Sequence, residues 1–344
     1  MSSAVQSAEP LADGDDAQVE QAPTPLQRLA AVPSTWTFLF LVALVTGFSL
    51  WSPSAFPTAD NLRNIGVDTS ILVIIAVGAA YVIITAGIDL SVGSVLVFSG
   101  VVAAKAMEAL GGGLGSILLG LVIALGCGVA WGVINGFLVA YARIPAFIAT
   151  LGTFSAATGF ALIISNGLDV RDVPPDLVAT VGNDDLLGQI PYLVIIAAFV
   201  AIGGAILLNQ TTFGRYTYAI GSNAEAARRA GIHVERHLLK VYGLAGLVAG
   251  LAGYLSLARF ATTTIGGHAT DNFQAITAVV LGGTSLFGGI GTIAGTVIGA
   301  FIPTVLNNGL VIVGVVPFWQ QVTVGVILVT AVYFDQWRRS RYRS

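Results

Sequence analysis

The chain has 344 residues, of which 55% are hydrophobic and only 10% are charged, and its mean hydropathy is +0.85. A soluble domain is about 25% charged, so too few polar side chains remain here to cover a surface in water. The composition predicts an integral membrane protein and excludes a soluble enzyme, a nucleic-acid binder and a disordered protein.

The first segment, residues 1–33, differs from the rest of the chain. It is rich in Ala, Asp, Gln and Pro, has no apolar periodicity, and predicts a disordered tail. No basic stretch precedes an apolar one, so a cleaved signal peptide is not expected. The net charge of −3 is concentrated here, because against the single base Arg28 stand five acids: Glu9, Asp13, Asp15, Asp16 and Glu20.

The segment 34–337 consists largely of long apolar runs. Because a helix needs about 20 apolar residues to cross a bilayer, these runs predict an all-α, polytopic membrane helix bundle. The expected spans are about ten: 35–52, 70–87, 91–109, 115–141, 145–165, 191–208, 239–260, 274–288, 290–311 and 317–336. The second and third spans are nearly contiguous, as are the eighth and ninth, so either pair could contain a broken or re-entrant helix.

The basic residues predict the orientation of the bundle. With ten spans and a cytoplasmic N-terminus, eleven of the fifteen basic residues fall inside, including Arg143, the segment 209–240 and the basic tail 338–344. The acidic loop 166–190 then falls outside. This agrees with the positive-inside rule and predicts that both termini are cytoplasmic.

Glycines recur at four-residue spacing within three of the predicted spans. Such stripes let helix backbones approach closely in lipid, and they predict a tightly packed bundle. They are Gly128, Gly132 and Gly136; Gly246 and Gly250; and Gly291, Gly295 and Gly299.

One carboxylate, Asp89, lies between two apolar spans in the sequence TAGIDLSVGS. Since a charge at membrane depth is costly, Asp89 needs a partner or a helix end. Together with Ser91 and Ser94 it could cap a helix that begins near residue 91, after a break at Gly87. Two interpretations stay open beside this structural one: a gating or pathway residue, and a proton-coupling carboxylate.

Several other polar residues fall within the predicted spans, and each could hydrogen-bond across helices or line a route for a polar solute. Arg259 is expected to pair with Asp271 or to extend its charge toward the membrane surface. The residues proposed for a translocation pathway or gate are Asp89, Ser91, Asn135, Thr150 and Gln274. Further polar residues of this kind are Thr153, Ser155, Thr158 and Thr277.

The central polar segment predicts a short helix at the cytoplasmic face. Asn223 can cap a helix over 224–230, and Gly231 can close it. Arg228 and Arg229 would then be exposed. A small amphipathic helix held between two spans suits docking into a groove of a partner protein.

No catalytic or cofactor-binding motif is apparent. The phosphate-binding pattern G-x-x-x-x-G-K-[ST] is absent, and the only lysines are Lys105 and Lys240. His233, His237 and His268 do not have metal-site spacing. Cys127 is the single cysteine, so no intrachain disulfide is possible. We therefore expect no enzymatic activity, no ATP hydrolysis by this chain alone, and no cofactor.

Three segments, AGIDLSVGS at 86–94, GRYTYAIGSN through ARRAGI at 214–232, and AITAVVLGGTSLFGGIGT at 275–292 followed by LNNGL, resemble the ribose-type sugar permeases of bacterial ABC importers. The likeness runs from about residue 35 to 336. It implies an inner-membrane homodimer or pseudo-dimer, a periplasmic solute-binding protein that delivers sugar, and a cytoplasmic ATPase subunit that docks on residues 214–232. The coupling residues that it implies are Gly214, Asn223, Ala226, Arg229 and Gly231.

These observations favour the permease subunit of an importer for a monosaccharide or a similar polar solute. The alternative is a secondary transporter that uses Asp89 as an ion-coupling site. A membrane enzyme or receptor is a third possibility, but it lacks a catalytic constellation.

Overall fold

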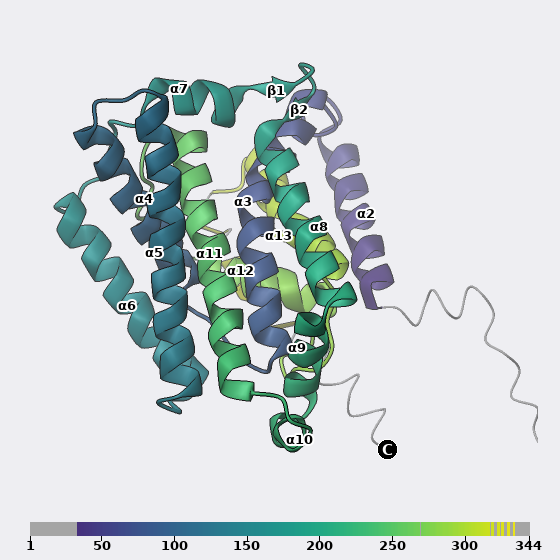
Figure 1. Cartoon of the computed structure of the whole chain (residues 1–344). Helices are drawn as coiled ribbons and strands as arrows, with labels where there is room; N and C mark the ends of the chain where they lie inside the picture. Colours follow the sequence, from purple (N-terminus) through teal and green to yellow (C-terminus); the bar gives the residue numbers. More distant parts are fainter. Residues whose placement is uncertain are drawn as a thin grey trace, which may run out of the picture.

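The computed structural model describes residues 33–268 and 270–316, and from there on only a few positions up to Tyr333. Its elements follow one another as helices, with one short antiparallel strand pair (Figure 1). They are α2 (Pro33–Trp51), α3 (Ala59–Ile84), α4 (Val92–Ala109), α5 (Leu114–Ala140), α6 (Ala146–Ser165), α7 (Pro175–Leu177), the π-helix η1 (Val178–Asn183), β1 (Asp185–Leu186), β2 (Ile190–Pro191), α8 (Tyr192–Gln210), α9 (Thr212–Ser222), α10 (Ala224–Arg229), α11 (Val234–Phe260), α12 (Asp271–Leu281) and α13 (Ile293–Ile312).

Eight of these helices are long and apolar enough to cross a membrane. They are α2, α3, α4, α5, α6, α8, α11 and α13, and each coincides with a predicted span. The prediction of a polytopic helical membrane protein is therefore confirmed. The tails predicted at 1–33 and 338–344 fall outside the described residues except for Pro33, and about half of the last predicted span, 317–336, does so too.

Two predicted spans have different bounds in the structure. The span predicted at 274–288 is the helix α12, whose 11 residues are about 17 Å long and too short to cross the bilayer alone. It ends at the run of glycines that begins with Gly282. The helix α3 begins at Ala59 rather than at residue 70, because Thr58 caps its start. The first turns of this helix are polar, so they do not form part of an apolar run.

The centre of the bundle is formed by α3 and α11. Within its most apolar stretch, α3 has 94% of its residues buried. The corresponding share is 17% for α8 and 11% for α2. Apolarity alone does not place α3 there, because lipid is as apolar as its run from Ile71 to Ile84. Its burial comes from contacts with α8, α11, α12 and α13. The outer helices expose large apolar side chains such as Phe40, Ile163 and Phe199, a surface that fits lipid.

Two glycine stripes, one on α5 and one on α11, form the most extensive helix contact in the described part of the bundle. A Cβ atom at Gly128 would collide with the carbonyl oxygen of Gly246, and one at Gly250 would collide with that of Ala124. At Gly132, the collision would be with the carbonyl oxygen of Tyr242. The backbones of α5 and α11 therefore touch directly, as the spacing of the glycines predicted.

The two charged connections lie at opposite ends of the bundle. Figure 1 shows α7, β1 and β2 at one end and α10 at the other. At the first end, Arg63 Nη2 lies 2.6 Å from Asp185 Oδ1 and ties the start of α3 to the strand pair. The acidic segment 166–190 and the basic segment 209–240 are thus separated along the helix axes, as the charge pattern predicted.

The predicted pairing of Arg259 with Asp271 is wrong. Arg259 Nη2 lies 3.1 Å from Asp68 Oδ1 instead, because α3 packs against the end of α11. Asp271 is already engaged, since its Oδ2 lies 2.6 Å from Nδ1 of His268, three residues earlier.

Replacement of Gly128 by valine is expected to destabilise the bundle. The new side chain would meet backbone atoms of Gly246 and Gly250, which cannot move aside as a flexible side chain could. Overpacking costs about 1–3 kcal/mol even in adaptable cores, so the thermal unfolding midpoint in detergent should fall by several degrees.

The matched control is Gly126→Val, on the same helix, where no atom lies within 4 Å of the added Cβ. It should unfold near the wild-type temperature. Equal effects of the two substitutions would contradict the close contact between α5 and α11.

Candidate functional site

The chain leaves helical geometry between α3 and α4, over residues 85–91. Ala86 has a positive φ of 62° and turns the chain away from α3. Oδ1 of Asp89 then accepts hydrogen bonds from the backbone N–H of Ser91, at 2.8 Å, and from its hydroxyl, at 2.6 Å. These bonds close a tight turn in front of α4, which begins at Val92, so the predicted break and restart are confirmed.

The turn is held by polar side chains from two neighbouring helices. Asn135 on α5 donates from Nδ2 to the hydroxyl oxygen of Ser91 at 2.7 Å, and Thr153 on α6 donates to Oδ1 of Asn135 at 2.6 Å. The hydroxyl oxygen of Thr150, also on α6, accepts from the backbone N–H of Leu90 at 3.1 Å. Oδ1 of Asp89 and the side chains of Ser91, Asn135 and Thr153 thus form one continuous chain of hydrogen bonds.

A third helix completes the network. Asn272 on α12 donates from Nδ2 to the carbonyl oxygen of Leu90 at 3.1 Å, so α12 grips the same segment from the other side. In the membrane interior a backbone group without a partner costs several kcal/mol, and Thr150 and Asn272 supply the partners that the missing helix turn would have provided. We call these seven residues the buried knot: Asp89, Leu90, Ser91, Asn135, Thr150, Thr153 and Asn272.

Four of the five predicted pathway residues belong to the buried knot. Asp89 is 4% exposed, Ser91 and Thr150 are fully buried, and Asn135 is 1% exposed. The fifth, Gln274, lies apart and lines a polar pocket in the half of the bundle that carries the strand pair. The proposed pathway set did not include Thr153, which was named only among the further polar residues, and Asn272 was not predicted at all. The spacing i, i+3 of Thr150 and Thr153 on one helix face was the available signal for Thr153.

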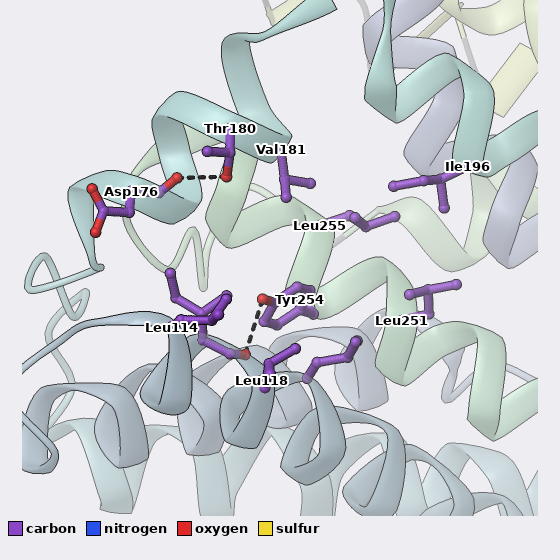
Figure 2. A pocket seen from close by; sticks show the side chains of 11 residues that line it. Leu114, Leu118, Asp176, Thr180, Val181, Ile196, Leu251, Tyr254 and Leu255 are labelled. Carbon is purple, nitrogen blue, oxygen red and sulfur yellow. Dashed lines mark hydrogen bonds between the residues drawn. The ribbon is translucent and has the colours of Figure 1, made fainter. Parts of the chain in front are cut away.

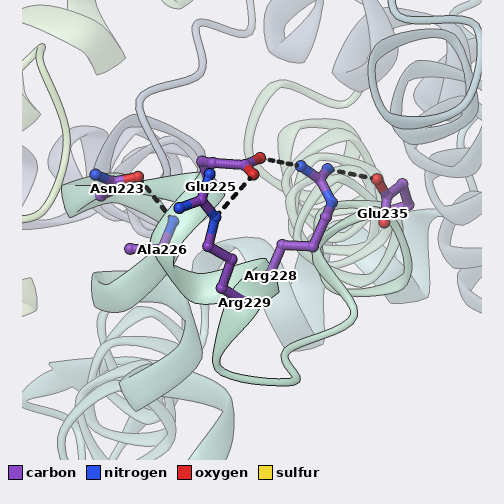
Figure 3. Close-up of polar contacts among 6 residues, drawn as sticks. All are labelled: Asn223, Glu225, Ala226, Arg228, Arg229 and Glu235. Atoms are coloured by element: carbon purple, nitrogen blue, oxygen red, sulfur yellow. Dashed lines mark hydrogen bonds and ion pairs between the residues drawn. The ribbon is translucent and has the colours of Figure 1, made fainter.

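At the opposite end of the molecule, α10 forms the predicted short helix (Figure 3). Oδ1 of Asn223 accepts from the backbone N–H of Ala226 at 2.9 Å and caps its start. After Ala230 the chain turns through Gly231, with φ of 85°, and the N–H of Ile232 returns to the carbonyl oxygen of Ala227. This is the glycine-terminated end that the sequence predicted.

Charged pairs cover the outer face of α10. Arg228 bonds Glu225 at 3.0 Å and Glu235 at 2.6 Å, and Arg229 bonds Glu225 at 3.3 Å. The bond to Glu235 raises the pKa of Arg228 above its usual value, so this side chain stays charged. Arg229 remains 80% exposed, whereas Ala227 is buried against Ile220 and Val234. The helix is thus anchored on one face and open on the other.

The sequence did not predict the helix α9, which precedes α10. Thr211 caps it, and the buried positions Gly214, Thr217 and Ile220 follow one face of a helix. Gly214, predicted as a coupling residue, is buried, because any Cβ there would collide with the carbonyl oxygen of Leu208. Gly214 therefore sets how α9 folds back on α8, while Asn223, Ala226, Arg229 and Gly231 lie on the surface.

The C-terminal end of α9 contacts the last residue of α3, directly before the break at 85–91, and the turn at 282–292. A Cβ at Gly221 would collide with the carbonyl oxygen of Ile84, and the hydroxyl of Tyr218 donates to the carbonyl oxygen of Gly291 at 2.7 Å. The N–H of Gly289 in turn donates to the carbonyl oxygen of Ile84 at 2.9 Å. A displacement of α10 would therefore be transmitted through α9 to both segments.

A second pocket, of about 480 Å³, lies between α5, α11, η1 and α8. Figure 2 shows Leu118, Leu251 and Leu255 in its wall, and Tyr254, whose hydroxyl donates to the carbonyl oxygen of Ile117 at 3.1 Å. Its lining is mostly apolar, so it offers few partners to a polar solute.

Comparison with known proteins agrees with this architecture. Residues 61–332 match the family described as "Branched-chain amino acid transport system / permease component". The chain is a member of this family of ABC transporter permeases. As a permease component it does not carry the ATPase activity of such a transporter, and it is a multi-pass membrane protein of a bacterial importer.

Curated relatives cover most of the chain. It is 40% identical over 302 residues to the "Ribose import permease protein RbsC" of Escherichia coli (strain K12), which covers 87% of this chain and 92% of the relative. It is 38% identical over 301 residues to the "D-allose transport system permease protein AlsC" of the same organism, covering 87% and 90%. It is 33% identical over 317 residues to the "Fructose import permease protein FrcC" of Rhizobium meliloti, covering 90% and 87%. No solved structure matches this chain.

Two substitutions at Asp89 are expected to separate its roles. Asp89→Ala removes the acceptor for two donors of Ser91, and leaving a buried donor unsatisfied costs about 1–3 kcal/mol, so uptake by the assembled transporter should be largely lost. Asp89→Asn keeps an oxygen at the same place and should retain most of the uptake. If Asp89→Asn is as inactive as Asp89→Ala, the charge and not the turn is what matters.

Proposed function

We propose that this chain is the membrane-spanning subunit of an ATP-driven importer for a monosaccharide. The observation that carries the proposal is the exposed, capped helix α10, which is connected through α9 to the two helix breaks. Relatives named for ribose, D-allose and fructose support the class of solute, since each is a monosaccharide.

The ATPase subunit would dock on α10 and on the exposed residues around it. A helix of six residues offers a small surface, but Asn223 and Gly231 fix both of its ends and the buried Ala227 fixes its rotation. A preorganised helix of this kind can enter a groove with little loss of conformational freedom. Movement of the ATPase would then push on α9 and, through it, on Ile84 and Gly289.

This assignment sets the orientation of the protein in the inner membrane. The end that carries α10 is cytoplasmic, and so are both termini, in agreement with the positive-inside rule. The acidic segment 166–190 then faces the periplasm, where a solute-binding protein would dock. A homodimer or pseudo-dimer of permeases is part of the proposal.

Ion coupling at Asp89, the alternative drawn from the sequence, has less support. Oδ1 of the carboxylate accepts two hydrogen bonds from Ser91 and closes the turn before α4, which is a structural role. Membership of an ABC permease family places the energy source in a separate ATPase subunit.

Reconstitution tests the proposal directly. We expect proteoliposomes that contain this chain, the ATPase and the solute-binding protein encoded with it to accumulate a radiolabelled monosaccharide only when ATP is supplied. Leucine serves as the control solute. Accumulation driven by a proton or sodium gradient with the permease alone, or of leucine in place of every sugar, would contradict the proposal.

Charge reversal on α10 tests the docking surface. Arg229→Glu and Asn223→Glu should abolish co-purification with the ATPase subunit in mild detergent. Arg229 is exposed and its pair with Glu225 contributes little to stability, so membrane insertion and the size-exclusion profile should not change.

The control is Arg143→Glu, an exposed base near Glu235 at the same end of the bundle but on the connection between α5 and α6. It should bind the ATPase more tightly than either α10 variant. ATPase binding at the wild-type level by Arg229→Glu and Asn223→Glu would rule out α10 as the docking helix.

A further inference from the structure

The polar pocket that contains Gln274 lies outside the buried knot and has a volume of about 400 Å³. This is within the range of about 300–1,000 Å³ for small-molecule sites. It is bounded by α3, α12, α13 and the connection that follows Phe260. Its polar lining residues include Asp68, Asp271, Gln274, Thr304, Asn307 and Asn308.

Hydrogen bonds to neighbouring residues hold several of these side chains in place. Ring nitrogens of His268 lie 2.7 Å from the hydroxyl of Ser256 and 2.6 Å from Oδ2 of Asp271. Asn308 exchanges two amide hydrogen bonds with Asn61, of 2.8 and 3.0 Å. The polar groups are therefore oriented before a ligand arrives, which lowers the entropic cost of binding.

Both acceptors and donors in this pocket have hydrogen-bonding capacity left over. Oδ1 of Asn307 is buried and has no partner among the described residues. The bond between Asp271 and His268 uses only Oδ2, and the bond between Asp68 and Arg259 uses only Oδ1, so each carboxylate keeps a second oxygen. The amide nitrogens of Gln274 and Asn308 each donate one hydrogen bond and keep a second N–H. A hydroxyl group both donates and accepts, so a ligand rich in hydroxyl groups fits this mixture.

The charges of the lining argue against a carboxylate-bearing solute. None of the described residues that line the pocket is Lys or Arg, and His268 already uses both ring nitrogens. An amino acid would place its carboxylate close to Asp68 and Asp271, and the neighbouring cation, Arg259, is already paired with Asp68. A neutral polyol meets no such repulsion, and the ring of Phe260 offers an apolar surface for its C–H groups.

We propose that this pocket binds a monosaccharide on its way through the permease. The inference rests on the proposed function for the identity of the solute, and it adds a binding site within the membrane-spanning chain itself. In the proposed orientation the pocket lies in the periplasmic half of the bundle.

The pocket and the buried knot are joined through consecutive residues of α12. Asp271 lines the pocket, and the next residue, Asn272, holds the carbonyl oxygen of Leu90. The carbonyl oxygen of His268 lies close to Gly93 in the first turn of α4, where a Cβ would be only 3.1 Å away. A ligand in the pocket would therefore lie next to the residues that hold the segment 85–91. From the opposite side, α9 contacts Ile84, directly before this segment.

Protection of a single cysteine tests the binding site without any transport assay. In a Cys127→Ala background, Gln274→Cys should react with a maleimide in lipid nanodiscs. A panel of aldopentoses, aldohexoses and ketohexoses serves as the probe. At twice its dissociation constant the sugar that binds should slow the reaction about threefold, since the free fraction falls as 1/(1 + [L]/Kd).

Two controls define the result. Labelling of Leu118→Cys, in the apolar pocket, should be unaffected by sugar, and leucine or a simple alkylamine should not protect Gln274→Cys. Unchanged labelling with every sugar, or equal protection by leucine or the amine, overturns the proposal.

A second variant separates binding from folding. Asn307→Leu removes a buried acceptor that has no partner, so it should leave the thermal unfolding midpoint unchanged or higher. Sugar uptake should nevertheless fall at least about tenfold, as expected for the loss of about 1.4 kcal/mol of binding. The control is Thr277→Val on α12, whose hydroxyl bonds only the carbonyl oxygen of Phe273, and which should keep most of the uptake.

The two proposals can fail separately. Sugar uptake by wild type together with full uptake by Asn307→Leu overturns the pocket and leaves the proposed function intact. Sugar protection of Gln274→Cys in a protein whose complex imports no sugar supports the pocket and overturns the proposed function.

Discussion

Every part of the proposed mechanism depends on one constraint: polar backbone groups inside a membrane need partners within the protein. The chain interrupts its helices at 85–91 and again at 282–292, and hydrogen bonds within the protein partner several of the backbone groups that these breaks leave free. Asp89 closes the turn before α4, Thr150 and Asn272 bond the backbone of Leu90, and the N–H of Gly289 bonds the last carbonyl of α3. Irregular backbone at this depth is tolerated only where it is buried in protein or lines a cavity. These are therefore the places where a rearrangement would exchange one set of partners for another.

The rigid part of the molecule has a different basis. α5 and α11 approach through glycines until their backbones touch, and α3 lies buried beside them. Close packing of this kind cannot deform gradually, because each backbone fills the space left by the missing side chains of the other. The helix breaks differ from this contact in function. The glycine contact provides a fixed frame, and the hydrogen-bonded segments at 85–91 and 282–292 can rearrange relative to it.

Sequence reasoning succeeded where one local rule decided the structure. Long apolar runs gave eight helices, the glycine spacing gave the α5–α11 contact, and Asn223 with Gly231 gave both ends of α10. It failed where residues far apart in the sequence compete as interaction partners. Arg259 turned to Asp68 rather than Asp271, and α12 proved too short to cross the membrane because the glycine-rich run after Leu281 ends it. The buried knot draws on α5, α6 and α12, and no spacing along the chain predicts which of their polar residues will meet.

The position of α12 explains how one short helix can relate events at the two membrane surfaces. Its first residue, Asp271, lines the polar pocket, its second, Asn272, holds the buried knot, and its C-terminal end leads into the turn at 282–292 that contacts α9. A solute in the pocket and an ATPase on α10 would therefore act on the same short element from opposite ends. Two ligands that bias one element are thermodynamically coupled, and each must then change the affinity for the other by the same factor. A helix that crossed the whole membrane would be anchored at both surfaces, whereas the 11 residues of α12 are held by side-chain hydrogen bonds at one end and by the close contact of Ala278 with Gly299 of α13, so α12 would move together with α13.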